Sequence, residues 1–553
     1  MHSTLTRREI LLFSGGIFLL LLFVFGRSLF NDFVFWDDPL VLIDNPISHG
    51  LTLRHIADAF SHYDPDLYVP LTFLSFQANF SLVGLHPFLY HLTNLLLHAG
   101  SALVIGWIML QLTGKTFTAA VVALLFAVHP INVEAVAWVS ARKDVLSGFF
   151  FLLSLALSLR SRHTADPRWY WMSVAAFLLG LLSKASILTL PVILLFLDEY
   201  RGKALTKESL MRTAPYALLS VAFGIVALFG KLAGTRTIGE KFLVGMQGVP
   251  LTLWHVIWPF NYSVLYPFAG EPSFGRLDLL ASVGAVACVS VLTVLVRRRF
   301  PSVFLGWWWF LALLLPSFLT VEKGQDLVPE LSVTSDRYAY LAGIGMFLIA
   351  AQACHLLERR IRRLGVLLAV GVIAALAVLA SLQSLTWTNT PSLMMHALKH
   401  NPDSSVAHNN LGVFYDANGD ADAAFREYEA AVRAGGTGDA WFNFGMALAK
   451  QRRFPEAITA LQNAVAVRPG YGIAHQNLGA FLLDAGDIQA SVDHLLIAQS
   501  LDPRNVTIYL NLGMALQRGG DVIDAVAAFK RALQLEPGSA FAQDALEKLK
   551  KKQ

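Results

Sequence analysis

The chain has little charge and almost no cysteine for its length. Only 15% of its 553 residues are Asp, Glu, Lys or Arg, whereas soluble globular domains have roughly 25%. The two cysteines, Cys288 and Cys354, both lie in apolar runs, which excludes a disulfide framework and a thiolate metal cluster. A formal net charge of +4 is too small, in a chain of this length, to indicate a nucleic-acid partner.

Apolar runs are plentiful instead, and they fill residues 10–385. A membrane-spanning helix needs about 20 apolar residues. The pattern predicts an all-α fold in two domains: a membrane helix bundle of about eleven spans over residues 1–386, followed by a soluble α-solenoid over residues 387–553. The predicted spans lie near residues 10–25, 90–112, 117–134, 145–160, 169–183, 186–198, 212–231, 277–296, 303–320, 338–356 and 365–385.

Basic loops predict the orientation, because cytoplasmic loops collect Lys and Arg. The first span follows Arg7 and Arg8 and lacks a small-residue cleavage site, so we expect a retained anchor that starts in the cytoplasm. Residues 243–260 contain Pro250 and Pro259, and we interpret them as a re-entrant or interfacial helix. Four arginine-rich loops then fall on the cytoplasmic side, while the loop at 27–89 and the C-terminal domain lie on the opposite side.

The C-terminal domain repeats a short pattern. Gly412, Gly445, Gly479 and Gly513 each follow Asn-Leu or Asn-Phe, and they recur at intervals of 33, 34 and 34 residues. This is the tetratricopeptide period. We predict four repeats and a polar capping helix, which form a groove for an extended polypeptide. The alternative is a purely structural stalk.

An acidic pair, Asp37-Asp38, follows the first predicted span closely. A carboxylate near the bilayer is costly, about 2.5–3.5 kcal/mol at the midplane, so such a pair suggests function. At the outer interface these carboxylates would lie at the depth of lipid head groups, where a general base could act on a hydroxyl acceptor. Alternatively, one of them caps a short helix that begins at Pro39.

Other charged residues are predicted at the same side of the membrane. Arg142, Lys143 and Lys184 could neutralise a phosphate, or could simply anchor loops at the interface. His129 and Glu134 could assist the acidic pair, or could join Asp38 in binding a divalent cation such as Mg²⁺ or Mn²⁺. The supporting residues of this predicted site are His129, Glu134, Asp144, Asp336 and Tyr338.

Asp336-Arg337-Tyr338 opens the tenth predicted span at its outer end. An arginine at a helix N-terminus binds phosphate well, because the helix dipole and the guanidinium act together. The alternative is a local structural pair between Asp336 and Arg337.

Several motifs occur together along the chain. They are Asn31-Asp32-Phe33-Val34 up to Asp37-Asp38, Asn45-Pro46, Tyr68-Val69-Pro70-Leu71, Leu85 to His91, His129-Pro130 to Val136 with Arg142 and Asp144, and Ser183-Lys184. In this combination, with the membrane part before the repeats, the chain resembles the transmembrane and tetratricopeptide-repeat-containing O-mannosyltransferases of the GT-C glycosyltransferase superfamily. Its short repeat array is more similar to prokaryotic relatives. Val69 stands where the family often has Arg, so this stretch is not assigned to phosphate binding.

The resemblance implies an inverting hexosyltransferase that moves a sugar from a polyprenyl phosphate to Ser or Thr of an exported protein held by the repeats. Asp37 or Asp38 would take the hydroxyl proton, while Arg337, Arg142 and Lys184 would stabilise the leaving phosphate. A requirement for a metal stays open. We expect the enzyme in the bacterial inner membrane, with its site and repeats on the periplasmic face.

Two other function classes are open. A repeat scaffold for envelope proteins would need only one membrane anchor. A transporter or flippase for lipid-linked sugars would place ionisable residues near the middle of its helices, whereas here they gather at helix ends.

Overall fold

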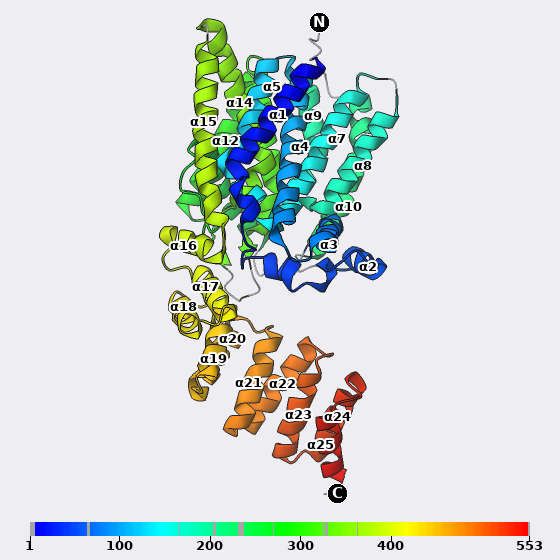
Figure 1. Ribbon diagram of the computed structural model, residues 1–553, viewed down its shortest axis with the longest axis vertical. Coiled ribbons are helices and arrows are strands. Elements are labelled where there is room, and N and C mark those ends of the chain that lie inside the picture. Colours follow the sequence, from blue (N-terminus) through cyan, green and yellow to red (C-terminus); the bar gives the residue numbers. More distant parts are fainter. Residues whose placement is uncertain are drawn as a thin grey trace. The chain divides into compact units, whose positions relative to one another are not determined.

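The computed structural model describes residues 6–63, 67–164, 166–202, 206–230, 237–268, 270–323, 326, 330–361 and 363–550 (Figure 1). This part is helical apart from two strands of two residues each, β1 (Glu322–Lys323) and β2 (Glu330–Leu331), which pair antiparallel. The predicted all-α fold is confirmed. The chain forms two compact units, one of Met1–Lys323 with Glu330–His400, the other of Gly324–Pro329 with Asn401–Gln553.

The first unit is a helix bundle. Its helices are α1 (Arg7–Phe25), α2 (Leu53–Ser61), α3 (Pro70–Val83), α4 (Pro87–Thr113), α5 (Thr116–Val128), α6 (Val133–Ala137), α7 (Arg142–Ser161), α8 (Arg168–Ser183), α9 (Leu190–Tyr200), α10 (Lys207–Phe229), α11 (Ile238–Ile257), α12 (Leu277–Val296), α13 (Pro301–Leu314), α14 (Ala339–Arg360), α15 (Leu364–Ser384) and α16 (Thr390–His400). Figure 1 shows the long helices running along one direction, with α2 and α3 at one end of the bundle.

Eight helices of the described residues are long and apolar enough to cross a membrane. They contain residues of α1, α4, α7, α10, α12, α13, α14 and α15, and a ninth span results if Thr116–Val128 and Pro130–Ala137, which are bent by 52°, count as one. The two remaining predicted spans correspond to α8 and α9, which have only 16 and 11 residues. α11, where we predicted a re-entrant helix, is not among the eight.

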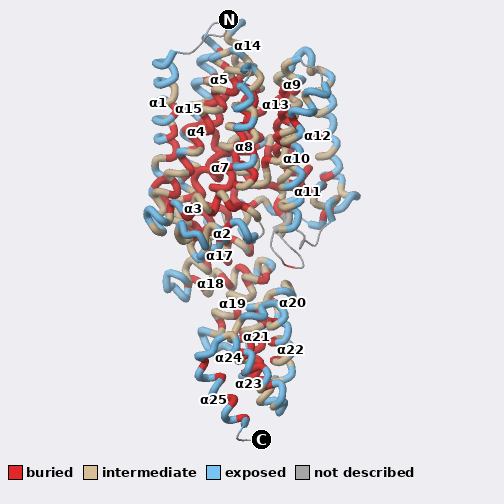
Figure 2. The backbone as a smooth tube through the Cα atoms, turned by 90° about the vertical axis from the view of Figure 1, so that its right-hand side faces the viewer, coloured by how far each residue is buried: buried red, intermediate tan, exposed pale blue. Residues whose placement is uncertain are grey.

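Buried and exposed residues are distributed differently over these helices (Figure 2). α7 has a largely buried surface, whereas α10 and α12 expose large apolar side chains such as Leu218 and Leu295, as expected of lipid-facing helices. α13 and α14 cross closely through glycines: a Cβ on Gly345 would lie 2.2 Å from the carbonyl oxygen of Gly306. Small residues at such crossings allow membrane helices to approach.

The second unit contains the four predicted repeats as helix pairs. They are α17 (Ser405–Ala417) with α18 (Ala421–Arg433), α19 (Gly438–Lys450) with α20 (Phe454–Val467), α21 (Gly472–Ala485) with α22 (Ile488–Leu501), and α23 (Val506–Gly519) with α24 (Val522–Leu535), followed by α25 (Ala540–Lys550). A Cβ on Gly412 would lie 2.5 Å from the ring of Tyr428 in the paired helix, which explains the recurring glycine. By spatial grouping, α16 lies with the first unit, although our division after residue 386 assigned it to the repeats.

Candidate active site

The loop after α1 separates the two carboxylates of the acidic pair. Asp38 is 1% exposed. Its carboxylate accepts hydrogen bonds from the backbone N–H of Val34 (2.8 Å) and of Ser140 (3.1 Å), and from the Ser140 hydroxyl. Burial raises the pKa of Asp38 to about 6, although these hydrogen bonds lower it. Its side chain does not cap the helical turn at Pro39–Ile43, so it ties the loop to the start of α7 instead.

Asp37 is the accessible member of the pair, with 38% of its side chain exposed. The Lys143 ammonium lies 3.5 Å from its Oδ2 atom. Both residues line a cavity of about 170 Å³ with Ser140, and the other walls are mostly apolar, including Val69 and Phe76. Asp37 can therefore meet an entering hydroxyl group, whereas Asp38 is already occupied by donors.

Arg337 comes from the turn that precedes α14 and is nearly buried, with 10% of its side chain exposed. Its guanidinium pairs with Glu134 of α6, and its backbone N–H donates to the other Glu134 oxygen at 3.1 Å. The guanidinium carbon lies 5.3 Å from the ring centroid of Trp138 and 5.0 Å from that of Tyr338. Its Nε has no hydrogen-bond partner among the described residues, so one donor remains for a ligand.

A second cavity, of about 60 Å³, is lined by Arg337, Lys184 and Asp144. Lys184 donates to Asp144 Oδ1 at 2.5 Å, while Asp144 Oδ2 has no partner in the described part of the chain. Burial lowers the pKa of Lys184, an effect that Asp144 opposes and that the nearby charges of Arg337 and Lys143 reinforce. Lys143, which pairs with Asp37, and Arg337 both lie against the Trp138 ring, 5.4 Å and 5.3 Å from its centroid. The two cavities therefore lie near the same ring.

Arg142 does not join this region. Its side chain is fully buried, and it donates to Asn94 and Asn79, to Ser75, and to the backbone oxygen of Tyr90. With its donors used inside the bundle, it joins α3, α4 and α7. The predicted phosphate contact of Arg142 does not agree with this geometry, and the next residue, Lys143, faces the cavity instead.

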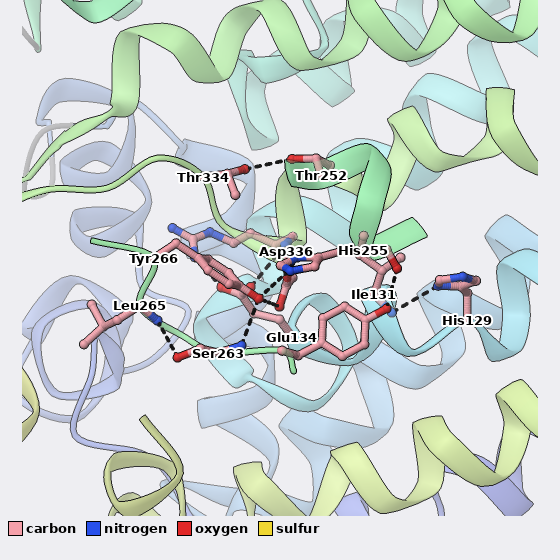
Figure 3. Close-up of polar contacts among 12 residues, drawn as sticks. His129, Ile131, Glu134, Thr252, His255, Ser263, Leu265, Tyr266, Thr334 and Asp336 are labelled. Carbon is pink, nitrogen blue, oxygen red and sulfur yellow. Dashed lines mark hydrogen bonds and ion pairs between the residues drawn. The ribbon is translucent and has the colours of Figure 1, made fainter. Parts of the chain in front are cut away.

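Asp336 points away from Arg337, so the local pair that we considered is wrong. Figure 3 shows His255 and Tyr266 converging on the Asp336 carboxylate. The His255 Nδ1 atom lies 3.3 Å from Oδ1, and the Tyr266 hydroxyl lies 3.0 Å from both oxygens. Burial and the Asp336 charge raise the pKa of Tyr266 well above its ordinary value, so the phenol stays a donor to the carboxylate.

His129 is occupied by the backbone. Its Nε2 lies 3.0 Å from the Val256 oxygen, and its Nδ1 accepts from the Ile131 N–H. His129, Glu134 and Asp38 therefore each have separate partners. No group of three or more His, Cys, Asp or Glu side chains within the described ranges is arranged to hold a metal ion.

Several residues of this region were not predicted. Ser140 is one of them, whereas Lys143 was named with Arg142 as a residue that could neutralise a phosphate; which of the two faces the cavity depends on helix rotation. Trp138 stacks on Trp387 at 5.6 Å. His255 and Tyr266 sit in or after α11, which has no site motif, so only tertiary structure brings them to Asp336.

Similarity to known proteins agrees with both units. A tetratricopeptide repeat family model matches residues 442–505 and 482–540, and another matches residues 393–426. Human protein O-mannosyl-transferase TMTC3 is 22% identical over 93% of this chain and 59% of its own length. The chain is a distant relative of the protein O-mannosyl-transferases TMTC1 to TMTC4.

Mouse TMTC1 is 39% identical over a shorter stretch, 25% of this chain and 16% of that protein. The chain thus spans less than two thirds of the length of these relatives. Among solved structures, YrrB, titled a TPR protein with an unusual peptide-binding site, matches 35% of this chain at 19% identity with a TM-score of 0.26.

Proposed function

We propose that this protein is an inverting GT-C glycosyltransferase that transfers a sugar, mannose or a similar hexose, from a polyprenyl phosphate to Ser or Thr of an exported protein. The observation that carries the proposal is an accessible carboxylate, Asp37, near the basic cavity of Arg337 and Lys184. The distant relationship to protein O-mannosyl-transferases supports the same chemistry.

Asp37 is the proposed general base. It takes the proton from the acceptor hydroxyl, whose oxygen then bonds to the anomeric carbon of the sugar. Asp38 cannot readily take this role, because three donors already occupy its oxygens. Instead it positions the loop, and Lys143 orients Asp37 from 3.5 Å away.

Arg337 and Lys184 are the proposed phosphate ligands. As the bond between the anomeric carbon and the phosphate oxygen breaks, the electron pair stays with that oxygen, and the two cations stabilise the polyprenyl phosphate that leaves. The unpartnered Nε of Arg337 supports this assignment. A divalent cation could share the phosphate charge, but no step here requires one.

The acceptor is proposed to bind the tetratricopeptide repeats, since such arrays present a concave surface to extended polypeptides. The site would face the periplasm of a bacterial inner membrane. In support, the basic residues Arg160, Arg162 and Arg168 lie where α7 ends and α8 begins, at the opposite ends of these helices from Lys143 and Lys184. A scaffold function would not account for the two cavities. A flippase function would not account for the accessible carboxylate of Asp37.

Arg337 variants test the phosphate assignment. Transfer from a polyprenyl-phosphate-linked mannose to a Ser/Thr peptide should fall roughly 100- to 1,000-fold in Arg337→Ala. Arg337→Lys should recover only part, because an ammonium lacks the planar fork. Arg298→Ala, an exposed arginine at the C-terminal end of α12, is the control and should keep full activity. Full activity in a well-folded Arg337→Ala protein would end the assignment.

A further inference from the structure

A cavity of about 940 Å³ lies outside the candidate active site, between the end of α7, the start of α8 and the start of α10. α7 has 20 residues and is therefore about 30 Å long, with Lys143 at one end and this cavity at the other. The cavity thus opens at the end of the bundle opposite to Asp37.

Its lining carries three basic side chains, Arg162, Lys207 and Arg212, and two carboxylates, Asp166 and Glu208, of which Glu208 pairs with Arg212. Cationic donors are what a phosphate ester requires, since its oxygens only accept hydrogen bonds.

Arg162 lies close to a second arginine. Arg162 is 10% exposed and pairs with the nearly buried Asp198 of α9. Arg201 shares this environment, and burial together with the charge of Arg162 lowers its pKa. Arg162 and Arg201, both partly buried, therefore share one carboxylate, that of Asp198.

Apolar surface borders the mouth of the cavity. Four large apolar side chains are 51% to 65% exposed here: Trp171 and Met172 of α8, and Leu210 and Met211 of α10. Both helices belong to the bundle. Such a surface beside basic groups matches a lipid, whose head group enters the cavity while its acyl chains cover the apolar side chains.

We infer that this cavity binds the phosphate of an anionic membrane lipid, held by Arg162, Lys207 and Arg212. The site is separate from the proposed donor site and does not depend on its activity. The lipid would fix α10, which is joined to the bundle core mainly through α8 and α9.

Native mass spectrometry of the full-length protein in detergent tests the inference with three added lipids: phosphatidylglycerol, phosphatidylcholine and a polyprenyl phosphate. We expect phosphatidylglycerol to bind at least about fivefold more tightly than phosphatidylcholine. Lys207→Gln should weaken this binding roughly fivefold, since it removes one exposed charge. Ser161→Phe should weaken it by narrowing the cavity, and Arg298→Gln, an exposed control, should leave it unchanged.

Lys207 is exposed at the first turn of α10, so its variant should fold even if Ser161→Phe does not. Affinity for phosphatidylglycerol and for polyprenyl phosphate that is no higher than for phosphatidylcholine, or binding that Lys207→Gln does not alter, would overturn the inference. Binding of polyprenyl phosphate alone, sensitive to Lys207→Gln, would support the phosphate site and identify the carrier lipid as its source.

Discussion

At the scale of single residues, the position of a residue in the sequence indicates which groups lie near it. It does not indicate the direction in which its side chain points. Consecutive residues on a helix point about 100° apart, so the charged run at 142–144 divides among three roles. Arg142 enters the bundle, Lys143 faces Asp37, and Asp144 binds Lys184. The sequence therefore indicates that these charges lie together, but which of them faces Asp37 depends on the rotation of the helix.

The pKa of Asp38 gives a pH-dependent prediction. Because burial raises its pKa from 3.8 to about 6, the folded protein holds a proton more tightly than the unfolded chain between these values. Its contribution to stability should be full below pH 4 and should fall as pH rises to about 6. Because the amide in Asp38→Asn cannot ionise, the stability of this variant should lack this dependence on pH.

Melting temperatures of both proteins in detergent, measured from pH 4 to pH 7, test this directly. The advantage of the wild type over Asp38→Asn should shrink as pH rises. An advantage that grows with pH would mean that the hydrogen bonds from Ser140 and Val34 outweigh the cost of burying the carboxylate.

At the scale of elements, length and apolarity predicted most of the membrane helices. α8 and α9 were harder, because with 16 and 11 residues they are shorter than a membrane-spanning helix needs. The bend between α5 and α6 follows His129-Pro130, where proline cannot donate a backbone hydrogen bond. The bend leads α6 to present Glu134 to Arg337.

The crossing of α13 and α14 gives a prediction for a helix pair. Gly345→Ala should destabilise the protein by about 1–3 kcal/mol, because the added Cβ would meet the backbone of Gly306. Gly284→Ala in α12 is the matched control, since no atom lies within 4 Å of its Cβ position. Thermal unfolding of the two variants in the same detergent should separate them. Equal melting temperatures would contradict the close crossing.

At the scale of the whole molecule, the repeat period predicted the second unit well, because each repeat packs mainly on its neighbours. The arrangement of the membrane unit was harder to predict, because Asp37, Lys184 and Arg337 come from segments that are far apart in the sequence. We predict that the repeats lie outside the cytoplasm, on the same side as Asp37. This orientation follows from the basic loops alone.

Cysteine labelling tests the orientation. In a variant without Cys288 and Cys354, Gly470→Cys offers an exposed position with free space for its side chain, and Arg298→Cys marks the opposite side. An impermeant maleimide should label position 470 and not position 298 in intact spheroplasts. Protection of position 470 there, with labelling only after lysis, would place the repeats in the cytoplasm.

The most direct test of the whole account is the transfer activity of Asp37→Asn. Asn cannot accept the hydroxyl proton, so turnover from polyprenyl-phosphate-linked mannose to a Ser/Thr peptide should fall at least about 100-fold. Because Asp37 is 38% exposed, the melting temperature of the variant should match that of the wild type. Wild-type turnover in a well-folded Asp37→Asn protein would contradict the account.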